Sequence, residues 1–361
     1  FAKTPGVKDT NGFTRQNWFE PVGKECKMLR EKAGIIDISN FAKYVVQGEK
    51  GRDWLDAVFA NKIPTEVGRS CLTPLISRRG GLAGDFTVTL IAQDEYWIFG
   101  SGMAERYHKR FFDSVPLPEG VSFDSRTEAV CGFNLAGPLS RKILQRLTNT
   151  SLNNEDFQFM RSKRADLAGI DVKMLRVSFT GDLGWEVHCN TADQKALYTA
   201  LLETGKEFGV GPVGSRALMA MRVEKGYGSW SREYSPEYWP HEQGMDRLCR
   251  MDKDFLNKAA LQAVLAQEPR EQMVLLHLNE AAVTASNADA TGGEPVFKDG
   301  NGVGRVTSGA YGYSVGISLA LAMVKDVGPG DEVEVMVLGQ PHKAKILHQP
   351  PFDPTGKKLR A

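Results

Sequence analysis

Asp85 is the first residue whose position could support chemistry. It lies in RRGGLAGDFTVTL, directly after a run of glycines and at the start of a β-prone run. An Asp in this setting commonly accepts a hydrogen bond from a backbone amide of the turn. The other interpretation is a carboxylate displayed at the end of a strand, where it orients or deprotonates an amine.

Glu186 is the second such residue, within SFTGDLGWEVH (residues 178–188). Strand alternation places Trp185 and Val187 on one face and Glu186, with Gly184 and His188, on the other. Either Glu186 faces water, or it is a buried acceptor. A buried carboxylate accepts two parallel N–H donors from a planar ring edge, and pterin and guanine rings present such an edge.

A third group lies in MRVEKGYGSW, where Arg222 and Glu224 stand at the predicted end of a helix before Gly226. Arg222 either belongs to a solvated helix terminus or reaches a carboxylate or oxo group of a ligand. An aromatic segment follows, which either packs between domains or lines a pocket for a flat ligand. Its large rings are Trp230, Tyr234, Tyr238 and Trp239.

The flanking sequence predicts hairpins and helices that position these residues. Residues 72–102 read as an antiparallel meander, with Gly80, Gly81 and Gly84 marking its first turn. Residues 172–190 read as a second hairpin. Further strands are predicted at 35–39, 43–48 and from 130. Helices are predicted at 20–33, 50–63, 103–115, after 138, at 192–209 and from 214.

The composition changes at about residue 270, where short strands separated by glycine turns begin. That pattern favours a small β-barrel or sandwich. A chain of 361 residues is long for one hydrophobic core. We therefore expect an α+β protein made of two α+β units and a C-terminal β domain.

Several function classes are disfavoured. The net charge is +1, from 45 basic and 44 acidic residues, with no basic block, which argues against nucleic acid or a membrane surface as partner. The five cysteines include no CxxC and the six histidines no short-spaced pair, so we expect neither a disulfide framework nor a metal site. The opening FAKTPGVKDTNGF does not resemble a secretory signal.

The sequence also lacks GxGxxG, GxxxxGK[ST], HExxH and GxSxG. No FAD or NAD fingerprint, phosphate loop, zinc-protease helix or serine-hydrolase elbow is therefore present. Any chemistry would rely on carboxylates, an Arg and a bound organic cofactor.

Four segments, in order and spread over nearly the whole chain, resemble the folate-binding aminomethyltransferase family typified by the glycine-cleavage T-protein. GGLAGDFTV resembles that family's glycine-turn-Asp element, and SFTGDLGWEVH its S-Y-T-G-E-x-G-x-E segment. ALMAMRVEKGY resembles its R-x-E-x-G segment, and residues 293–324 its C-terminal barrel. Residues 17–48, 60–75 and 350–361 look most like the C-terminal half of dimethylglycine and sarcosine dehydrogenases.

This resemblance implies a three-domain cloverleaf around a central folate channel. Residues 1–265 would form two interleaved α+β domains and residues 266–361 a C-terminal β-barrel. The implied activity is tetrahydrofolate-dependent transfer of a methyl-derived carbon from an N-methylated amine, giving 5,10-methylenetetrahydrofolate. FAD would be involved only through an upstream flavin oxidoreductase domain or a separate subunit. The location would be the cytoplasm, or the mitochondrial matrix in a eukaryote.

The resemblance also implies roles for individual residues. Asp85 would be the catalytic residue near folate N5 and N10, and Glu186 would bind the edge of the pterin ring. Phe179 stands where the family usually has Tyr, so the aromatic face survives but a phenolic hydroxyl is lost. The remaining candidate cofactor contacts are Thr87, Gly100, Val187, His188 and Arg222.

Three other activities stay open at this point. A free-standing tetrahydrofolate-dependent demethylase, such as one acting on dimethylsulfoniopropionate, shares this fold. A non-catalytic folate-binding accessory protein resembles K-G-C-Y-x-G-Q-E where this chain has KGYGSWSREY, which lacks that Cys. The third is the T-protein itself, which works on a lipoyl-carried aminomethyl group. The sequence does not identify the methyl donor, the folate product or the oligomeric state.

Overall fold

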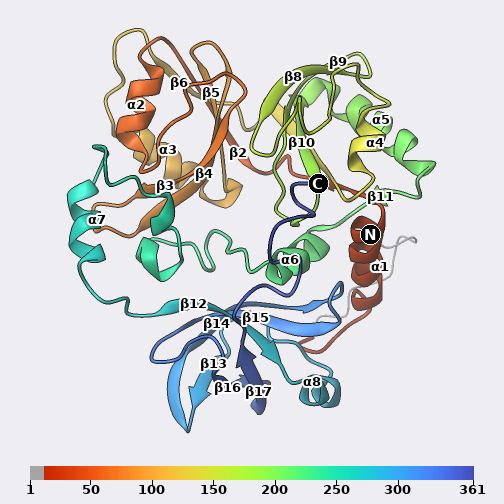
Figure 1. Ribbon diagram of the computed structural model, residues 1–361, viewed down its shortest axis with the longest axis vertical. Helices are drawn as coiled ribbons and strands as arrows, with labels where there is room; N and C mark the ends of the chain where they lie inside the picture. The colour runs from red at the N-terminus through yellow and green to blue at the C-terminus, as the bar shows by residue number, and fades with distance from the viewer. Residues whose placement is uncertain (1–11) are drawn as a thin grey trace.

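The computed structural model describes residues 12–361. It has two open sheets, each forming a lobe with its helices in the upper half of Figure 1, and a closed barrel below them. This arrangement confirms the predicted α+β class and the predicted three-lobed architecture with a C-terminal barrel. The sequence predicts no secretory signal in the opening segment. Most of that segment lies outside the described residues. Within the described residues, no helix is long and apolar enough to cross a membrane.

The first lobe contains a five-stranded antiparallel sheet, here called sheet I, in the order β3-β4-β5-β2-β6. One face packs against α2 and α3, because alternate residues of β4 such as Phe86, Val88 and Leu90 are apolar and buried with the helices. The elements of this lobe are β2 (Ala42–Gln47), α2 (Gly51–Val58), β3 (Ser70–Ile76), β4 (Leu82–Ala92), β5 (Glu95–Gly100), η1 (Gly102–Ala104), α3 (Glu105–Asp113) and β6 (Ser122–Ser125).

The second lobe contains a six-stranded sheet, here called sheet II, in the order β11-β1-β7-β10-β9-β8. All neighbours are antiparallel except β1 and β11. The chain enters sheet II with β1, leaves it to build sheet I, and then returns. The elements are β1 (Gly34–Asp37), β7 (Val130–Ala136), α4 (Ser140–Leu144), β8 (Ser162–Leu167), β9 (Ile170–Leu175), β10 (Gly184–Asn190), η2 (Thr191–Asp193), α5 (Gln194–Lys206) and β11 (Gly211–Pro212).

Helices α1 (Phe19–Glu31) and α6 (Ser215–Glu224) pack together between the sheets and the barrel. A long connection then runs from α6 across the middle of the molecule to α7 and the barrel (Figure 1). It contains the aromatic segment that the sequence singled out. Its regular pieces are η3 (Pro240–Glu242), η4 (Asp246–Leu248) and α7 (Lys258–Leu265).

The C-terminal unit is a closed barrel in the order β12-β15-β14-β13-β16-β17. This result decides between the two architectures that the strand pattern allowed. Small apolar side chains of β15, among them Ala320, Ala322 and Val324, fill the interior. The elements are β12 (Gln272–Leu278), α8 (Glu280–Ser286), β13 (Pro295–Lys298), β14 (Asn301–Gly312), β15 (Ile317–Val324), β16 (Glu332–Val337) and β17 (Gln340–Ile346).

One local prediction was wrong. Gly84 does not belong to the first turn of the meander but lies inside β4, next to an irregularity in the pairing with β3. A methyl group there would lie 2.4 Å from the Phe86 ring and 2.9 Å from His108 Nε2. A glycine is needed because an aromatic ring and an imidazole occupy the space of a side chain. Gly80 and Gly81 do lie in the turn before Leu82, and Gly80 has a φ of +79° that favours glycine.

Candidate functional site

The candidate site lies where sheet I faces sheet II. An apolar cluster joins the two sheets, with Trp97 and Phe99 from β5 meeting Leu175 from β9. The rings of Phe99 and His188 stack across the interface, with centroids 4.6 Å apart and planes 30° from parallel. Side chains on these two faces therefore approach each other from different sheets.

Asp85 and Thr87 lie on the interface face of sheet I. Thr87 pairs directly with Phe99, so the two share a face, and Asp85 is two residues before Thr87 on the same strand. Glu186 lies on the interface face of sheet II, because it pairs directly with Leu175 of the joining cluster. The structure thus brings the two carboxylates predicted from sequence to the same interface.

One carboxylate oxygen of the half-buried Asp85 is left without a hydrogen-bonding partner in the described part of the chain. Its Oδ1 atom is buried and has no hydrogen bond within residues 12–361. Burial raises the pKa of this carboxyl to about 6. Tyr234 of the aromatic segment lies near Asp85. Burial raises the pKa of the Tyr234 hydroxyl to about 12, and the negative charge of Asp85 adds to this shift. A buried, unpartnered carboxylate is costly to keep unless a ligand pairs with it.

Glu186 has one oxygen occupied and one available. The side chain is 13% exposed, and its Oε2 lies 3.4 Å from Nε2 of the buried His188. No hydrogen bond to Oε1 occurs within residues 12–361. The buried amine of Lys43 donates to the carbonyls of Ser39 and Phe41 at 2.9 and 2.7 Å. Burial lowers the Lys43 pKa to about 8, and the nearby Glu186 charge opposes that shift.

Phe179 lies in the segment between β9 and β10 and stacks on Tyr227 with centroids 6.2 Å apart and planes at 18°. Helix α1 holds this segment in place, because Arg30 donates to Thr180 O at 2.7 Å and pairs with the buried Asp182. Phe179 therefore provides a positioned aromatic face beside the strand that carries Glu186.

The structure defines the surroundings of three other predicted contact residues. Val187 is fully buried in the core of sheet II, on the face opposite Glu186, so its side chain does not line the interface. His188 contacts Glu186 and Phe99. Gly100 faces the core of the first lobe, where a methyl group would lie 2.7 Å from the ring of Phe86.

The tight packing at Gly100 gives a testable prediction. We expect Gly100→Ala to lower the free energy of unfolding by about 1–3 kcal/mol, because Phe86 is closely surrounded and cannot move freely. Gly328→Ala is the matched control, since a methyl group there has open space. Urea unfolding followed by circular dichroism measures the difference. Equal stability of the two variants would contradict the prediction.

Arg222, predicted as a ligand contact, is buried and paired with other parts of the chain, which favours a structural role. It is 1% exposed, and its guanidinium pairs with Glu233 at 2.9 Å and donates to Ser308 Oγ of β14 at 2.5 Å. Glu224 is also buried, and it accepts from Arg30 Nη2 at 2.6 Å and from the Ser314 amide at 2.8 Å. The R-x-E pair thus connects α6 to the barrel rather than to a pocket.

The aromatic segment mostly packs between lobes. Trp230 lies edge-on to His108 of α3 at 5.0 Å, and the Trp239 ring lies 4.1 Å from the Arg270 guanidinium carbon. Tyr238 Oη accepts from Arg305 Nη2 of the barrel at 2.5 Å. Tyr238 therefore packs against the barrel and Trp230 against the first lobe, which agrees with the packing interpretation, while Tyr234 lies near Asp85.

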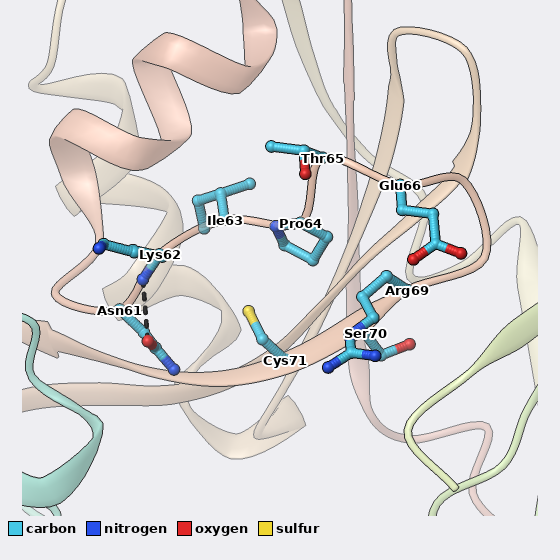
Figure 2. A pocket seen from close by; sticks show the side chains of 9 residues that line it. All are labelled: Asn61, Lys62, Ile63, Pro64, Thr65, Glu66, Arg69, Ser70 and Cys71. Carbon is cyan, nitrogen blue, oxygen red and sulfur yellow. Dashed lines mark hydrogen bonds between the residues drawn. The ribbon is translucent and has the colours of Figure 1, made fainter. Parts of the chain in front are cut away.

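Two surface pockets lie apart from the candidate site. Figure 2 shows the first, of about 280 Å³, which is lined by Asn61–Glu66 and Arg69–Cys71. The second, of about 480 Å³, is lined by residues of and around α4. Neither contains a predicted site residue. Within residues 12–361, no group of three or more His, Cys, Asp or Glu side chains is placed to hold a metal ion, and all five cysteines are free.

Comparisons with known proteins agree with this architecture. The fold matches the crystal structure of glycine cleavage system aminomethyltransferase T from Bartonella henselae with a TM-score of 0.82, covering 92% of this chain and 90% of that one at 21% identity. Mouse mitochondrial dimethylglycine dehydrogenase is 33% identical over 346 residues, which are 94% of this chain and 39% of that protein. A probable aminomethyltransferase from Thermococcus kodakarensis is 26% identical over 383 residues, covering 96% of this chain and 94% of that protein.

The chain spans about two-fifths of the length of the dimethylglycine dehydrogenases it matches. The family model of the GCVT N-terminal domain matches residues 1–253, and that of the glycine cleavage T-protein C-terminal barrel domain matches residues 272–353. The chain therefore belongs to the glycine cleavage T-protein (GCVT) family.

Proposed function

We propose that this chain binds tetrahydrofolate between sheets I and II and captures on it the methyl-derived carbon of an N-methylated amine of the dimethylglycine or sarcosine type. The carbon arrives as an iminium or formaldehyde, after a flavin has taken two electrons from the methyl group. The product would be 5,10-methylenetetrahydrofolate. The observation that carries the proposal is the shared interface of Asp85 and Glu186, one with a buried unpartnered oxygen and the other with an oxygen free to accept.

The residues present fit a folate. Glu186 offers a carboxylate to a planar pair of N–H donors, and such charge-assisted pairs are strong and selective when partly buried. Phe179 and Tyr227 offer stacked aromatic faces next to that strand. When bound, tetrahydrofolate supplies amine nitrogens that accept the carbon. We assign recognition of the ring edge to Glu186 and proton transfer or orientation of the amine to Asp85.

Asp85 is suited to this task by its environment. With a pKa near 6 it is largely ionised at pH 7, yet it remains a far stronger base than an exposed carboxylate. Its unpartnered oxygen leaves it free to pair with an amine or an iminium. In this proposal Thr87, on the same face of β4, supplies a polar contact beside Asp85.

The N-methylated amine is proposed from the relatives' names. Besides the dimethylglycine dehydrogenases, they include 4-methylaminobutanoate oxidase (formaldehyde-forming) from Paenarthrobacter nicotinovorans, 27% identical over 361 residues. Those 361 residues are 43% of that protein. We propose that a flavin oxidoreductase domain or subunit carrying FAD accepts the two electrons and delivers the oxidised methyl carbon.

Calorimetric titration with tetrahydrofolate tests the proposal. We expect Glu186→Gln to weaken binding by about 1.5–3 kcal/mol, or about ten- to a hundredfold, because it removes the charged acceptor of the ring edge. Glu155→Gln, a change at an exposed carboxylate, is the control and should bind like the wild type. A well-folded wild type that does not bind tetrahydrofolate would overturn the proposed function.

A further inference from the structure

His188 connects the carboxylate of Glu186 to the opposite sheet. The imidazole has no solvent exposure. One side of it meets Glu186, with Nε2 3.4 Å from Oε2, while its face stacks on Phe99 of sheet I at 4.6 Å. A single ring therefore contacts both the proposed ligand-binding residue and the neighbouring lobe.

The surroundings favour the neutral form of this ring and a proton on Nε2. Burial lowers the pKa of His188 first, Glu186 opposes that shift, and the charges of Lys43 and Lys173 reinforce it. Lys173 lies directly opposite His188 on β9. A neutral imidazole carries one proton, and Nδ1 is buried with no partner within residues 12–361. The tautomer with the proton on Nε2 is therefore favoured, because Nε2–H can donate to Glu186.

Space for the ring is provided by the neighbouring strand. Gly132 of β7 pairs directly with His188, and a methyl group at Gly132 would lie 2.5 Å from Nδ1. The imidazole is therefore held on its Nδ1 side by backbone, on its face by Phe99 and at Nε2 by Glu186. These contacts leave the ring little room to turn away from Glu186 while sheet I lies against it.

We infer that His188 is a positioning residue: its Nε2–H holds one oxygen of Glu186 so that the other points to the ligand, and it does so only while sheet I is seated against sheet II. This inference rests on the proposed function, because the ligand is the folate assigned there. It adds that folate affinity depends on the contact between two lobes and not on Glu186 alone.

A matched set of substitutions tests the inference. The amide nitrogen of Gln can occupy the place of Nε2, whereas that of Asn reaches only the place of Nδ1. We expect His188→Gln to bind tetrahydrofolate within about threefold of the wild type, and His188→Asn and His188→Phe to bind about tenfold more weakly, since each loses a charge-assisted hydrogen bond. In steady-state kinetics the loss should appear mainly as a higher KM for tetrahydrofolate and less as a lower kcat.

The control is His342→Phe, since His342 is a buried imidazole of the barrel that hydrogen-bonds to Ser286. It should leave folate affinity unchanged. Equal affinities across the Gln, Asn and Phe variants would overturn the positioning role while leaving the proposed function intact. Absence of folate binding by the wild type would overturn both.

A measurement on the wild-type chain covers the case in which the variants fold poorly. Nitrogen NMR of ¹⁵N-labelled histidine, assigned with the His188→Gln variant or by elimination among the six histidines, reports the tautomer directly. We expect the Nε2–H form of His188 from pH 6 to 8. An Nδ1–H form, or a charged ring in this range, would overturn the inference.

Discussion

Replacing Asp85 by Asn is expected to slow one-carbon transfer by about 10²–10⁴-fold, the usual contribution of a positioned acid or base. The substitution keeps the size and shape of the side chain but removes the charge and the ability to take a proton. Tetrahydrofolate affinity should change by less than about threefold, because the loss concerns the reacting nitrogen and not ring recognition. Steady-state turnover with dimethylglycine-derived formaldehyde or iminium as carbon donor measures the effect.

The pH dependence of the wild type follows from the same residue. A base must be ionised, and burial raises the Asp85 pKa to about 6. We therefore expect kcat/KM to rise with pH through about 6 and to level off above 7. In Asp85→Asn this rise should disappear. Asp124→Asn, a change at an exposed carboxylate on β6 of the same sheet, should keep both the rate and the pH profile.

The sign of the stability effect distinguishes a functional Asp85 from a structural one. A carboxyl whose pKa is higher in the folded state lowers stability when it is ionised, and this cost disappears as the pH falls below its raised value. Asp85→Asn should therefore leave stability unchanged or slightly increased at pH 7. A clear loss of stability together with full activity would show that Asp85 supports the fold and not the reaction.

The sequence predicted those features of the site that depend on neighbouring residues, and it did not predict those that depend on contacts between distant segments. Glu186 and its strand were predictable because a strand repeats every two residues, and the burial of Trp185 and Val187 confirms the faces assigned to them. The same alternation should have excluded Val187 as a ligand contact, because it shares the face of Trp185.

The roles of Arg222 and Glu233 could not be predicted in this way. Their ion pair joins α6 to the aromatic segment, and Ser308, 86 positions beyond Arg222, completes it. No local pattern marks which carboxylate an Arg meets across such a distance. The sequence signal was the charged residue within an aromatic segment, SWSREY, which is unusual for a packing loop unless a buried partner neutralises it.

The position of Asp85 was intermediate between these cases. Its strand was predicted, but the chain reads as if Gly84 ended a turn, whereas β4 begins at Leu82 and continues through both residues. Which face Asp85 occupies follows only from the pairing of Thr87 with Phe99. The pairing of β4 with β5, which the local sequence does not show, therefore places Asp85 at the interface of the two sheets and not in a turn.

Replacing Arg222 by Met is expected to lower the free energy of unfolding by about 3–5 kcal/mol, because it leaves a buried carboxylate without its partner. That carboxylate is Glu233, which has no solvent exposure. Its Oε1 accepts from Ser308 Oγ at 2.5 Å and from Thr307 Oγ1 at 2.7 Å. These two hydroxyls cannot replace a guanidinium charge, so the connection between α6 and the barrel should weaken.

Removing both charges separates the two causes of this loss. The double variant Arg222→Met with Glu233→Gln should recover part of the stability, since no uncompensated charge remains. Arg146→Met is the matched control, because its pair with Glu207 is on the surface, with side chains 46% and 67% exposed. Such pairs contribute about 0–1 kcal/mol. Urea unfolding followed by circular dichroism compares the four proteins.

Folate binding by the same variants decides between the two roles of Arg222. If Arg222 is structural, Arg222→Met should bind tetrahydrofolate with wild-type affinity at temperatures where it remains folded, because its guanidinium contacts Glu233, Tyr227 O and Ser308. If it contacted the ligand, affinity would fall by about ten- to a hundredfold, while stability changed little. Only the first result agrees with a residue that is 1% exposed and committed to other parts of the chain.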